Sequence, residues 1–235
     1  MKKTIFMLTI LSLMSFSLLY AQEKSPSANV DCNYSEKYTG VDFNVGVGYS
    51  GVTFDHYYLD SARTRSEDDK AVSGTGFAVL GKLGGTYGFC KYWIVGLDVY
   101  GQYNSAKHTK QAAELFHERS ITTKIDYNLG GDFRLGLVSR PSNMYFLTIG
   151  PDWGHYKMSY SSTHLTESYS NSSSEFKLGL RFGAGAEQKF SETWVVKEQF
   201  SYTWYQSIHH THSDSSTSTV KPRLAAMTFS IGYLF

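Results

Sequence analysis

The feature that most constrains the fold of this chain is an alternation of apolar and polar side chains that returns in segment after segment. In the last eleven residues, small or polar residues separate most of the apolar positions, which are Ala225, Met227, Phe229, Ile231, Tyr233 and Phe235. Because successive side chains of a β-strand point to opposite faces, this pattern predicts a strand with one apolar face and one small or polar face.

The first residues predict export from the cytoplasm. Lys2 and Lys3 precede an apolar run over residues 5–19, and the small residue Ala21 follows it. We expect a signal peptide over residues 1–21, with an uncleaved anchor as the alternative. The run is shorter than the roughly 20 residues that a membrane helix needs, and no later apolar stretch is longer. We therefore expect no membrane-spanning helix.

The charge balance excludes a large basic surface. The formal net charge is +1, and it becomes −1 when Lys2 and Lys3 leave with the signal peptide. Binding to nucleic acid needs a clear excess of basic residues. We expect no nucleic-acid partner.

The alternation predicts eight strands in the mature chain. They cover residues 41–50, 77–87, 93–102, 121–137, 144–160, 176–187, 193–205 and 225–235. Long polar connections are expected near 52–73, 105–120, 161–174 and 207–221, and short ones near 89–91, 139–143 and 190–193. An even number of strands with alternating short and long connections is typical of barrels in the bacterial outer membrane. Pro151 and Gly154 suggest a bulge in the fifth strand.

The polar face of these strands decides which side is the interior. A soluble barrel of the lipocalin type would place its apolar face inward. Here the polar face combines charged residues with many glycines, which a narrow lumen requires because eight strands cannot all place large side chains inside. The sequence therefore predicts an all-β, eight-stranded antiparallel transmembrane up-and-down β-barrel over residues 41–235, preceded by a periplasmic segment over 22–40.

The chain resembles the family of small outer-membrane β-barrels that includes the barrel domain of outer membrane protein A, the X-type proteins and the opacity-like porins. The resemblance covers essentially the whole mature chain and is closest over Phe176–Tyr205, which includes the segments Lys177–Phe190 and Ser191–Trp194, and over Ala225–Phe235. It implies a Gram-negative outer-membrane location, contact with outer-membrane lipids, and recognition of the terminal strand by the barrel-assembly machinery. Glu198 departs from the pattern because it falls on the lipid-facing phase, so either a bulge re-phases its strand or it lies near the interface.

Charged residues on the inward phase are the main candidate site. They are Asp42, Lys82, Asp98, Lys124, Asp126, Asp132, Arg134, Lys177, Arg181, Glu187, Lys189 and Lys197. In a narrow lumen they should pair, since an isolated buried charge is costly. One interpretation is a barrel plugged by ion pairs. The other is a narrow gated pore in which lysine and arginine exchange partners.

Aromatic residues near strand ends are expected at the membrane interfaces, with a carbohydrate-binding platform as the alternative. They are Tyr87, Trp93, Trp194, Trp204, Tyr205, Tyr233 and Phe235. Amphipathic rings favour the depth of the lipid headgroups.

Two further groups of residues are candidates for bonds outside the barrel wall. Cys32 precedes the first strand and Cys90 lies in the turn after the second, so both should lie at the periplasmic rim, where the oxidising compartment favours a disulfide. His209, His210 and His212 form a dense imidazole cluster in the last loop, which is a weak candidate for zinc or copper. The Ser- and Thr-rich surroundings favour a solvated loop instead, and no soluble cofactor is implied.

The sequence leaves three functions open. The first is a structural and surface-interaction role, resembling adhesion, in which four extracellular loops contact a host or matrix ligand. The second is a low-conductance porin for small solutes. The third is a lipid-modifying enzyme at the rim, but His, Ser and acidic residues in loops do not define a catalytic geometry. We expect no enzymatic activity.

Overall fold

A computed structural model describes residues 34–59, 66–114, 117–164, 167–211 and 217–235. All of them belong to one compact unit, residues 33–235. The proposed signal peptide and most of the proposed periplasmic segment lie outside the described residues. No helix in the described part of the chain is both long enough and apolar enough to cross a membrane.

Ten strands and one short 3-10 helix make up this unit. They are η1 (Glu36–Tyr38), β1 (Gly40–Leu59), β2 (Ser66–Gly88), β3 (Trp93–Asn104), β4 (Lys107–Glu114), β5 (His117–Arg140), β6 (Asn143–His164), β7 (Glu167–Lys189), β8 (Trp194–Tyr205), β9 (Ile208–Thr211) and β10 (Thr217–Leu234).

Eight of the strands close into an antiparallel ring, as the sequence predicted. The order is β1-β2-β3-β5-β6-β7-β8-β10, and β10 pairs back with β1 from Asp42↔Leu234 to Leu59↔Thr217. The two short strands lie outside this ring, because β4 pairs with β5 and β9 pairs with β10. Closure leaves no free edge among the eight strands, which a structure in lipid requires because no water is present to satisfy open backbone groups.

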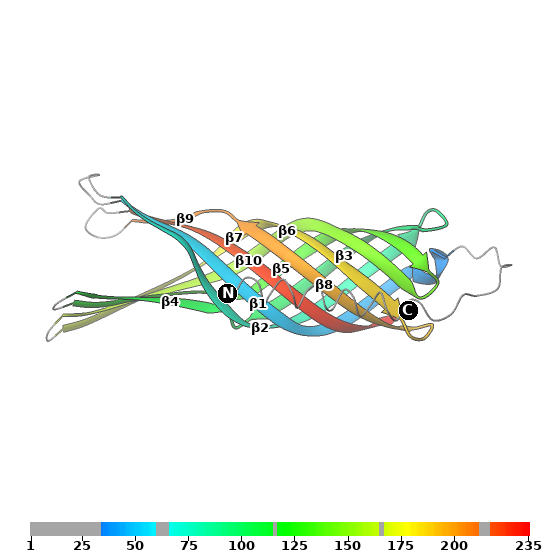
Figure 1. The fold of residues 1–235 in the computed structure, drawn as a ribbon, viewed down its shortest axis with the longest axis horizontal. Coiled ribbons are helices and arrows are strands. Elements are labelled where there is room, and N and C mark those ends of the chain that lie inside the picture. The colour runs from blue at the N-terminus through cyan, green and yellow to red at the C-terminus, as the bar shows by residue number, and fades with distance from the viewer. Residues whose placement is uncertain (1–33, 60–65, 115–116, 165–166, 212–216) are drawn as a thin grey trace, which may run out of the picture. The chain divides into compact units, whose positions relative to one another are not determined.

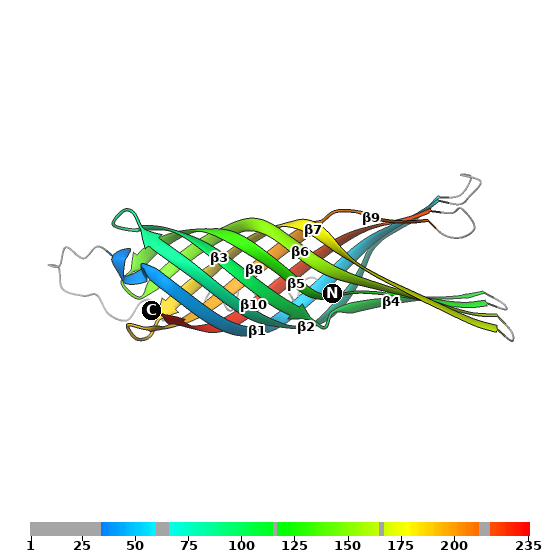
Figure 2. The same ribbon diagram turned by 180° about the vertical axis from the view of Figure 1, so that it is seen from behind.

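The prediction of four long loops is largely wrong, because the strands continue through most of the residues assigned to them. β1 and β2 pair out to Leu59↔Ser66, and β6 and β7 pair out to His164↔Glu167. These segments are rich in Ser and Thr and show little alternation of apolar and polar residues, so the pattern of the sequence did not reveal them. Figures 1 and 2 show the extensions as two diverging bundles, one formed by β1, β2, β9 and β10 and the other by β4, β5, β6 and β7.

A bulge lies in β5 and not, as expected, in β6. Ile125 pairs with Tyr156 and Tyr127 pairs with His155, so Asp126 is an extra residue on β5. The pairing of β6 with β7 is continuous over its whole length. The extra residue reverses the inside and outside of β5 beyond Tyr127. The pairing of β8 with both neighbours is also continuous, so no bulge re-phases Glu198, which faces outward.

The outer wall is an apolar band between two levels of aromatic side chains. At the end with the short turns, the exposed rings include Tyr87, Phe89, Tyr92, Trp93, Tyr145, Phe190, Trp194 and Phe235. Toward the strand extensions they are Tyr49, Phe77, Tyr103, Tyr127, Trp153, Phe176 and Trp204. Exposed Val, Leu and Ile side chains cover the band between them. Tyr205 is an exception to the expected girdle, since it is buried in the interior.

The end of the N-terminal segment packs into the barrel end with the short turns. Tyr38 of η1 is buried in a cluster with Ile94, Val138, Met144 and Phe146. Its carbonyl accepts a hydrogen bond from Thr86 Oγ1. Burial, with Glu187 nearby, raises the pKa of Tyr38 well above its ordinary value, so the ring stays neutral and fills this end of the lumen.

Glycine on the inward face is required by side chains that fill the lumen. A Cβ on Gly84 would collide with the Asp98 carboxylate and lie 3.2 Å from Arg134 Nη2 and from Asp42 Oδ1. A Cβ on Gly81, which faces outward on the same strand, has no atom within 4 Å. We expect Gly84→Ala to lower the free energy of unfolding in detergent micelles by about 1–3 kcal/mol. Gly81→Ala is the matched control and should leave it unchanged, and equal effects would contradict this packing.

The described N-terminal residues run beside the turn that carries Cys90. The Ser35 backbone N–H donates to the Lys91 carbonyl at 3.2 Å, and the rings of Tyr34 and Tyr92 lie 5.7 Å apart. Cys90 is exposed and forms no disulfide with a described residue, whereas Cys32 lies outside the described residues. The disulfide between them therefore stays a prediction.

Thiol labelling of the periplasmically exported protein tests that disulfide. Cys32 is three residues before Ser35 in the sequence, and Ser35 contacts Lys91, the residue next to Cys90. We expect no labelling of the denatured protein without reductant and two labels after reduction. Two labels without reductant would exclude the bond, and Cys90→Ser should release one thiol at Cys32.

Candidate functional site

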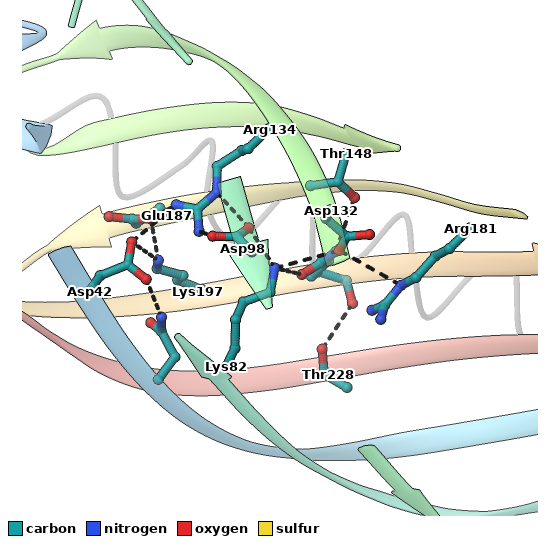
Figure 3. Close-up of polar contacts among 12 residues, drawn as sticks. Asp42, Lys82, Asp98, Asp132, Arg134, Thr148, Arg181, Glu187, Lys197 and Thr228 are labelled. Carbon is teal, nitrogen blue, oxygen red and sulfur yellow. Dashed lines mark hydrogen bonds and ion pairs between the residues drawn. The ribbon is translucent and has the colours of Figure 1, made fainter. Parts of the chain in front are cut away.

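The centre of the lumen holds a continuous chain of charged side chains with alternating sign. Its order is Glu187, Lys197, Asp42, Arg134, Asp98, Lys82, Asp132 and Arg181. These residues come from β1, β2, β3, β5, β7 and β8, and Figure 3 shows them converging across the interior. The chain therefore ties six of the eight wall strands together through side chains, in addition to the backbone ladders.

Most neighbours in this ion chain are within hydrogen-bonding distance, whereas Arg181 Nε lies 4.0 Å from Asp132 Oδ2 and neither of these two side chains has a hydrogen-bond partner among the described residues. Lys197 Nζ lies 3.0 Å from both Asp42 Oδ2 and Glu187 Oε2. Arg134 binds Asp98 through two nitrogens, Nε at 3.0 Å and Nη2, and its Nη1 lies 3.2 Å from Asp42. Lys82 reaches Asp98 at 3.0 Å and Asp132 at 3.8 Å.

Burial makes this pairing obligatory. Every charged side chain in the ion chain is at most 4 % exposed. Asp98 and Asp132 are directly opposite each other on β3 and β5, where two like charges repel. Lys82 lies between their carboxylates and removes that repulsion. A buried charge without a partner is far more costly than a buried pair, so each member depends on its neighbours.

A second polar group continues the filling of the lumen toward the strand extensions. Asp152 of β6 accepts hydrogen bonds from Asn128, Thr203 and Tyr205 at 2.9–3.0 Å. Arg181 lies over the ring of Tyr100 at 4.0 Å. Asp152 was not among the predicted lumen charges, because a bulge was expected near Pro151 and Gly154 and would have changed the phase of this strand. The even-numbered positions from Met144 to Asp152 all point inward and were the available signal.

Apolar clusters lie on both sides of these polar layers. The cluster around Tyr38 closes the end with the short turns. At the other end, buried side chains from six strands meet beyond Asp152; they include Val52, Phe54, Ile125, Tyr156, Ile208, Val220 and Leu224. The described residues thus fill the lumen at three levels, with charge in the middle and apolar side chains toward both ends.

A small cavity of about 110 Å³ lies at the mouth, between the two bundles of strand extensions. Thr123 and Tyr156 line one side, and Ile208 and Val220 line the other. The Thr123 and Tyr156 hydroxyls are buried and have no hydrogen-bond partner within the described ranges. Glu175 also lines the cavity, and Lys177 Nζ lies 3.1 Å from its carboxylate. The cavity can accept a small group that offers both hydrogen bonds and apolar surface.

Four candidate lumen charges lie outside the ion chain, and for Lys124 the expected inward position is wrong. The bulge in β5 turns Lys124 to the outer wall, where its side chain is 41 % exposed, and it places Asp126 beside His155 and Lys157. Lys177 lies at the mouth with Glu175 and does not join the ion chain. Lys189, near the short turns, donates to the Lys37 carbonyl.

The histidine cluster is only partly within the described structure. His209 is exposed, and its Nδ1 lies 3.0 Å from Thr219 Oγ1. The side chain of His210 and the whole of His212 lie outside the described residues. Among the side chains that are described, no three His, Cys, Asp or Glu residues converge as metal ligands.

Comparison with known proteins identifies the family. Residues 8–235 match the model of the outer membrane protein beta-barrel domain. The chain belongs to this family. It is located in the outer membrane of Gram-negative bacteria, with its apolar band in contact with outer-membrane lipids.

Individual relatives are distant. The chain is 24 % identical over 198 residues to the 31 kDa outer-membrane immunogenic protein of Brucella melitensis biotype 1, covering 82 % of this chain and 80 % of the relative. Among solved structures, Ail, the attachment invasion locus protein of Yersinia pestis, is 14 % identical, with a TM-score of 0.37 over 84 % of this chain and 99 % of Ail. OprG from Pseudomonas aeruginosa is 15 % identical, with a TM-score of 0.42 over 84 % of this chain and 97 % of OprG.

Arg134 is the member of the ion chain whose loss should be most costly. Its guanidinium contacts Asp42, Asp98 and Glu187. We expect Arg134→Met to lower the free energy of unfolding by about 3–5 kcal/mol, because it leaves buried carboxylates without their cation. Urea titration of the refolded barrel measures this change. Arg140→Met, at an exposed turn, is the control, and equal stability of both variants would contradict the role of Arg134.

Proposed function

We propose that the protein acts by contact at the cell surface and does not conduct solutes. The observation that carries this proposal is the filled lumen, in which a balanced ion chain is enclosed between two apolar clusters. A conducting pore needs a continuous water-filled path lined by polar groups. Opening one here would require separating buried ion pairs and moving apolar side chains at both ends, so the geometry favours the surface role over the porin alternative.

The strand extensions are the surface that we propose for this contact. The ring separates beyond Ala78↔Asn104 and beyond Gly179↔Tyr205, which are the last pairs of β2 with β3 and of β7 with β8 toward the extensions. Two sheets therefore leave the barrel, and the cavity of about 110 Å³ lies between them. The name of the Brucella relative, an immunogenic protein, is in keeping with exposure of such extensions at the surface. We propose a host or matrix macromolecule as the adhesion-like ligand.

Planar-bilayer recording tests the closed barrel. We expect the refolded mature protein to show no steady single-channel steps under conditions in which a general porin conducts. Reproducible ohmic steps that disappear with heat denaturation would support the porin alternative. A general porin refolded in the same way provides the conducting reference.

Shortened extensions test the surface role. Replacing residues 112–119 by Asn-Gly keeps the register of β4 and β5, because Gln111 pairs with Ser120. Replacing residues 162–169 by Asn-Gly keeps the register of β6 and β7, because Ser161 pairs with Ser170. We expect cells that display the doubly shortened protein to lose at least tenfold in adhesion to immobilised matrix glycoproteins. Shortening β1 and β2 over 58–67, which keeps the pair Tyr57↔Asp68, tests the other bundle separately. Unchanged adhesion by every variant would contradict the proposal.

A further inference from the structure

We propose that the outer wall at Lys107, Lys124 and Lys157 binds the phosphate groups of glycolipid in the outer leaflet of the membrane. This site is separate from the lumen and lies on the outer face of β4, β5 and β6, where the strand extensions begin. It does not rest on the proposed surface role.

The three lysines form a row across neighbouring strands. Lys107 of β4 is directly opposite Lys124 of β5, and Lys124 is directly opposite Lys157 of β6. Directly opposed residues in an antiparallel pair point to the same face, with Cβ atoms about 4.5–5.5 Å apart. All three side chains are on the outside, where Lys107 is exposed and Lys124 and Lys157 are 41 % and 46 % exposed.

Such a row repels itself unless an anion lies beside it. Like charges directly opposite on a sheet are destabilising. Within the described ranges, Asp126 is the one carboxylate in contact with the row, at 3.5 Å from Lys124 Nζ and 3.1 Å from Lys157 Nζ. Its other oxygen lies 2.8 Å from His155 Nδ1. Lys124 and Lys157 thus share one carboxylate, and with Lys107 beside them the row keeps an excess of positive charge that a phosphate would neutralise.

The depth of the row matches a lipid headgroup. Tyr127 and Phe176 belong to the outer aromatic level, and His155 packs between them, 4.5 Å from the Tyr127 ring. Lys157, the partner of Lys124, is two residues beyond His155 on β6, which corresponds to roughly 5 Å along the membrane normal for a strand tilted by about 40°. Aromatic rings prefer the headgroup boundary. The lysines therefore lie where the phosphorylated sugars of an outer-leaflet glycolipid begin.

The bulge at Asp126 creates this arrangement. Without the extra residue, Lys124 would point into the lumen with the other inward positions of β5. With it, Lys124 joins Lys107 and Lys157 outside, and Asp126 contacts both Lys124 and Lys157. An ammonium on a flexible stem is a point charge that suits phosphate oxygens of variable position.

The test uses the full mature protein in vesicles of stated composition. Wild-type protein is refolded into phosphatidylcholine vesicles that contain bisphosphorylated lipid A, the same lipid A after removal of both phosphates, or phosphatidylglycerol. Bound lipid is counted by native mass spectrometry after extraction into detergent, and the unfolding midpoint is followed by heat-modified gel mobility. We expect retained bisphosphorylated lipid A and a raised midpoint, with neither effect from the dephosphorylated lipid.

The lysine variants then assign the site. A lysine near an anionic surface contributes about fivefold to affinity, so Lys107→Gln, Lys124→Gln and Lys157→Gln together should weaken binding on the order of 100-fold. Lys107→Gln alone, at an exposed position, should weaken binding of bisphosphorylated lipid A about fivefold. This single variant still tests the site if the triple variant does not fold. The triple Lys→Arg variant should retain binding.

A matched charge control and a free-anion control complete the design. Lys37→Gln, Lys91→Gln and Arg140→Gln remove the same charge from exposed positions at the opposite end of the barrel and should leave binding unchanged. Equal loss in this control, equal retention of the dephosphorylated lipid or of phosphatidylglycerol, or no effect of the lysine substitutions would overturn the proposal. Equal stabilisation by millimolar inorganic phosphate would also overturn it, because the site would then bind a free anion.

Discussion

The structure depends on one constraint, which is that charges inside a narrow barrel must neutralise each other. Eight side chains of alternating sign, from Glu187 to Arg181, form a continuous chain of contacts across the lumen. They come from six strands, so the pairing stabilises the closed ring as a whole and not one local contact. The space for them exists because inward positions such as Gly84 carry no side chain. A narrow lumen therefore requires both the inward glycines, which leave space, and the paired charges, which neutralise each other.

The proposed closed lumen places any specific activity on the surfaces of the barrel. The polar layers lie between two buried apolar clusters, one toward each end of the barrel. Three surfaces remain for contact with other molecules. These are the apolar band with its aromatic levels, the strand extensions with the cavity between them, and the basic outer wall just beyond Tyr127.

A single extra residue, Asp126, shapes both the mouth of the barrel and the basic outer wall. Asp126 interrupts the alternation of β5, so that Ile125 enters the apolar cluster at the mouth while Lys124 turns outward. Bulges next to functional surfaces commonly re-aim side chains in this way. In this barrel the same insertion completes the closure of the lumen and assembles the row of lysines.

The sequence by itself determined the architecture, because a period of two with a glycine-rich charged face has few solutions for a chain that crosses a membrane. It also determined that residues such as Asp42, Lys82, Asp98, Asp132, Arg134, Arg181 and Glu187 share the inward phase, since phase is a local property of each strand. The tertiary structure alone decided which of them pair, because partners such as Arg134 and Asp42 are 92 residues apart in sequence. It also decided the positions of Lys124 and Asp126, the inward phase of Asp152, and the length of the strand extensions. A bulge and an exposed, Ser-rich strand leave no periodic signal, and their conformation is set by the neighbouring strands with which they pair.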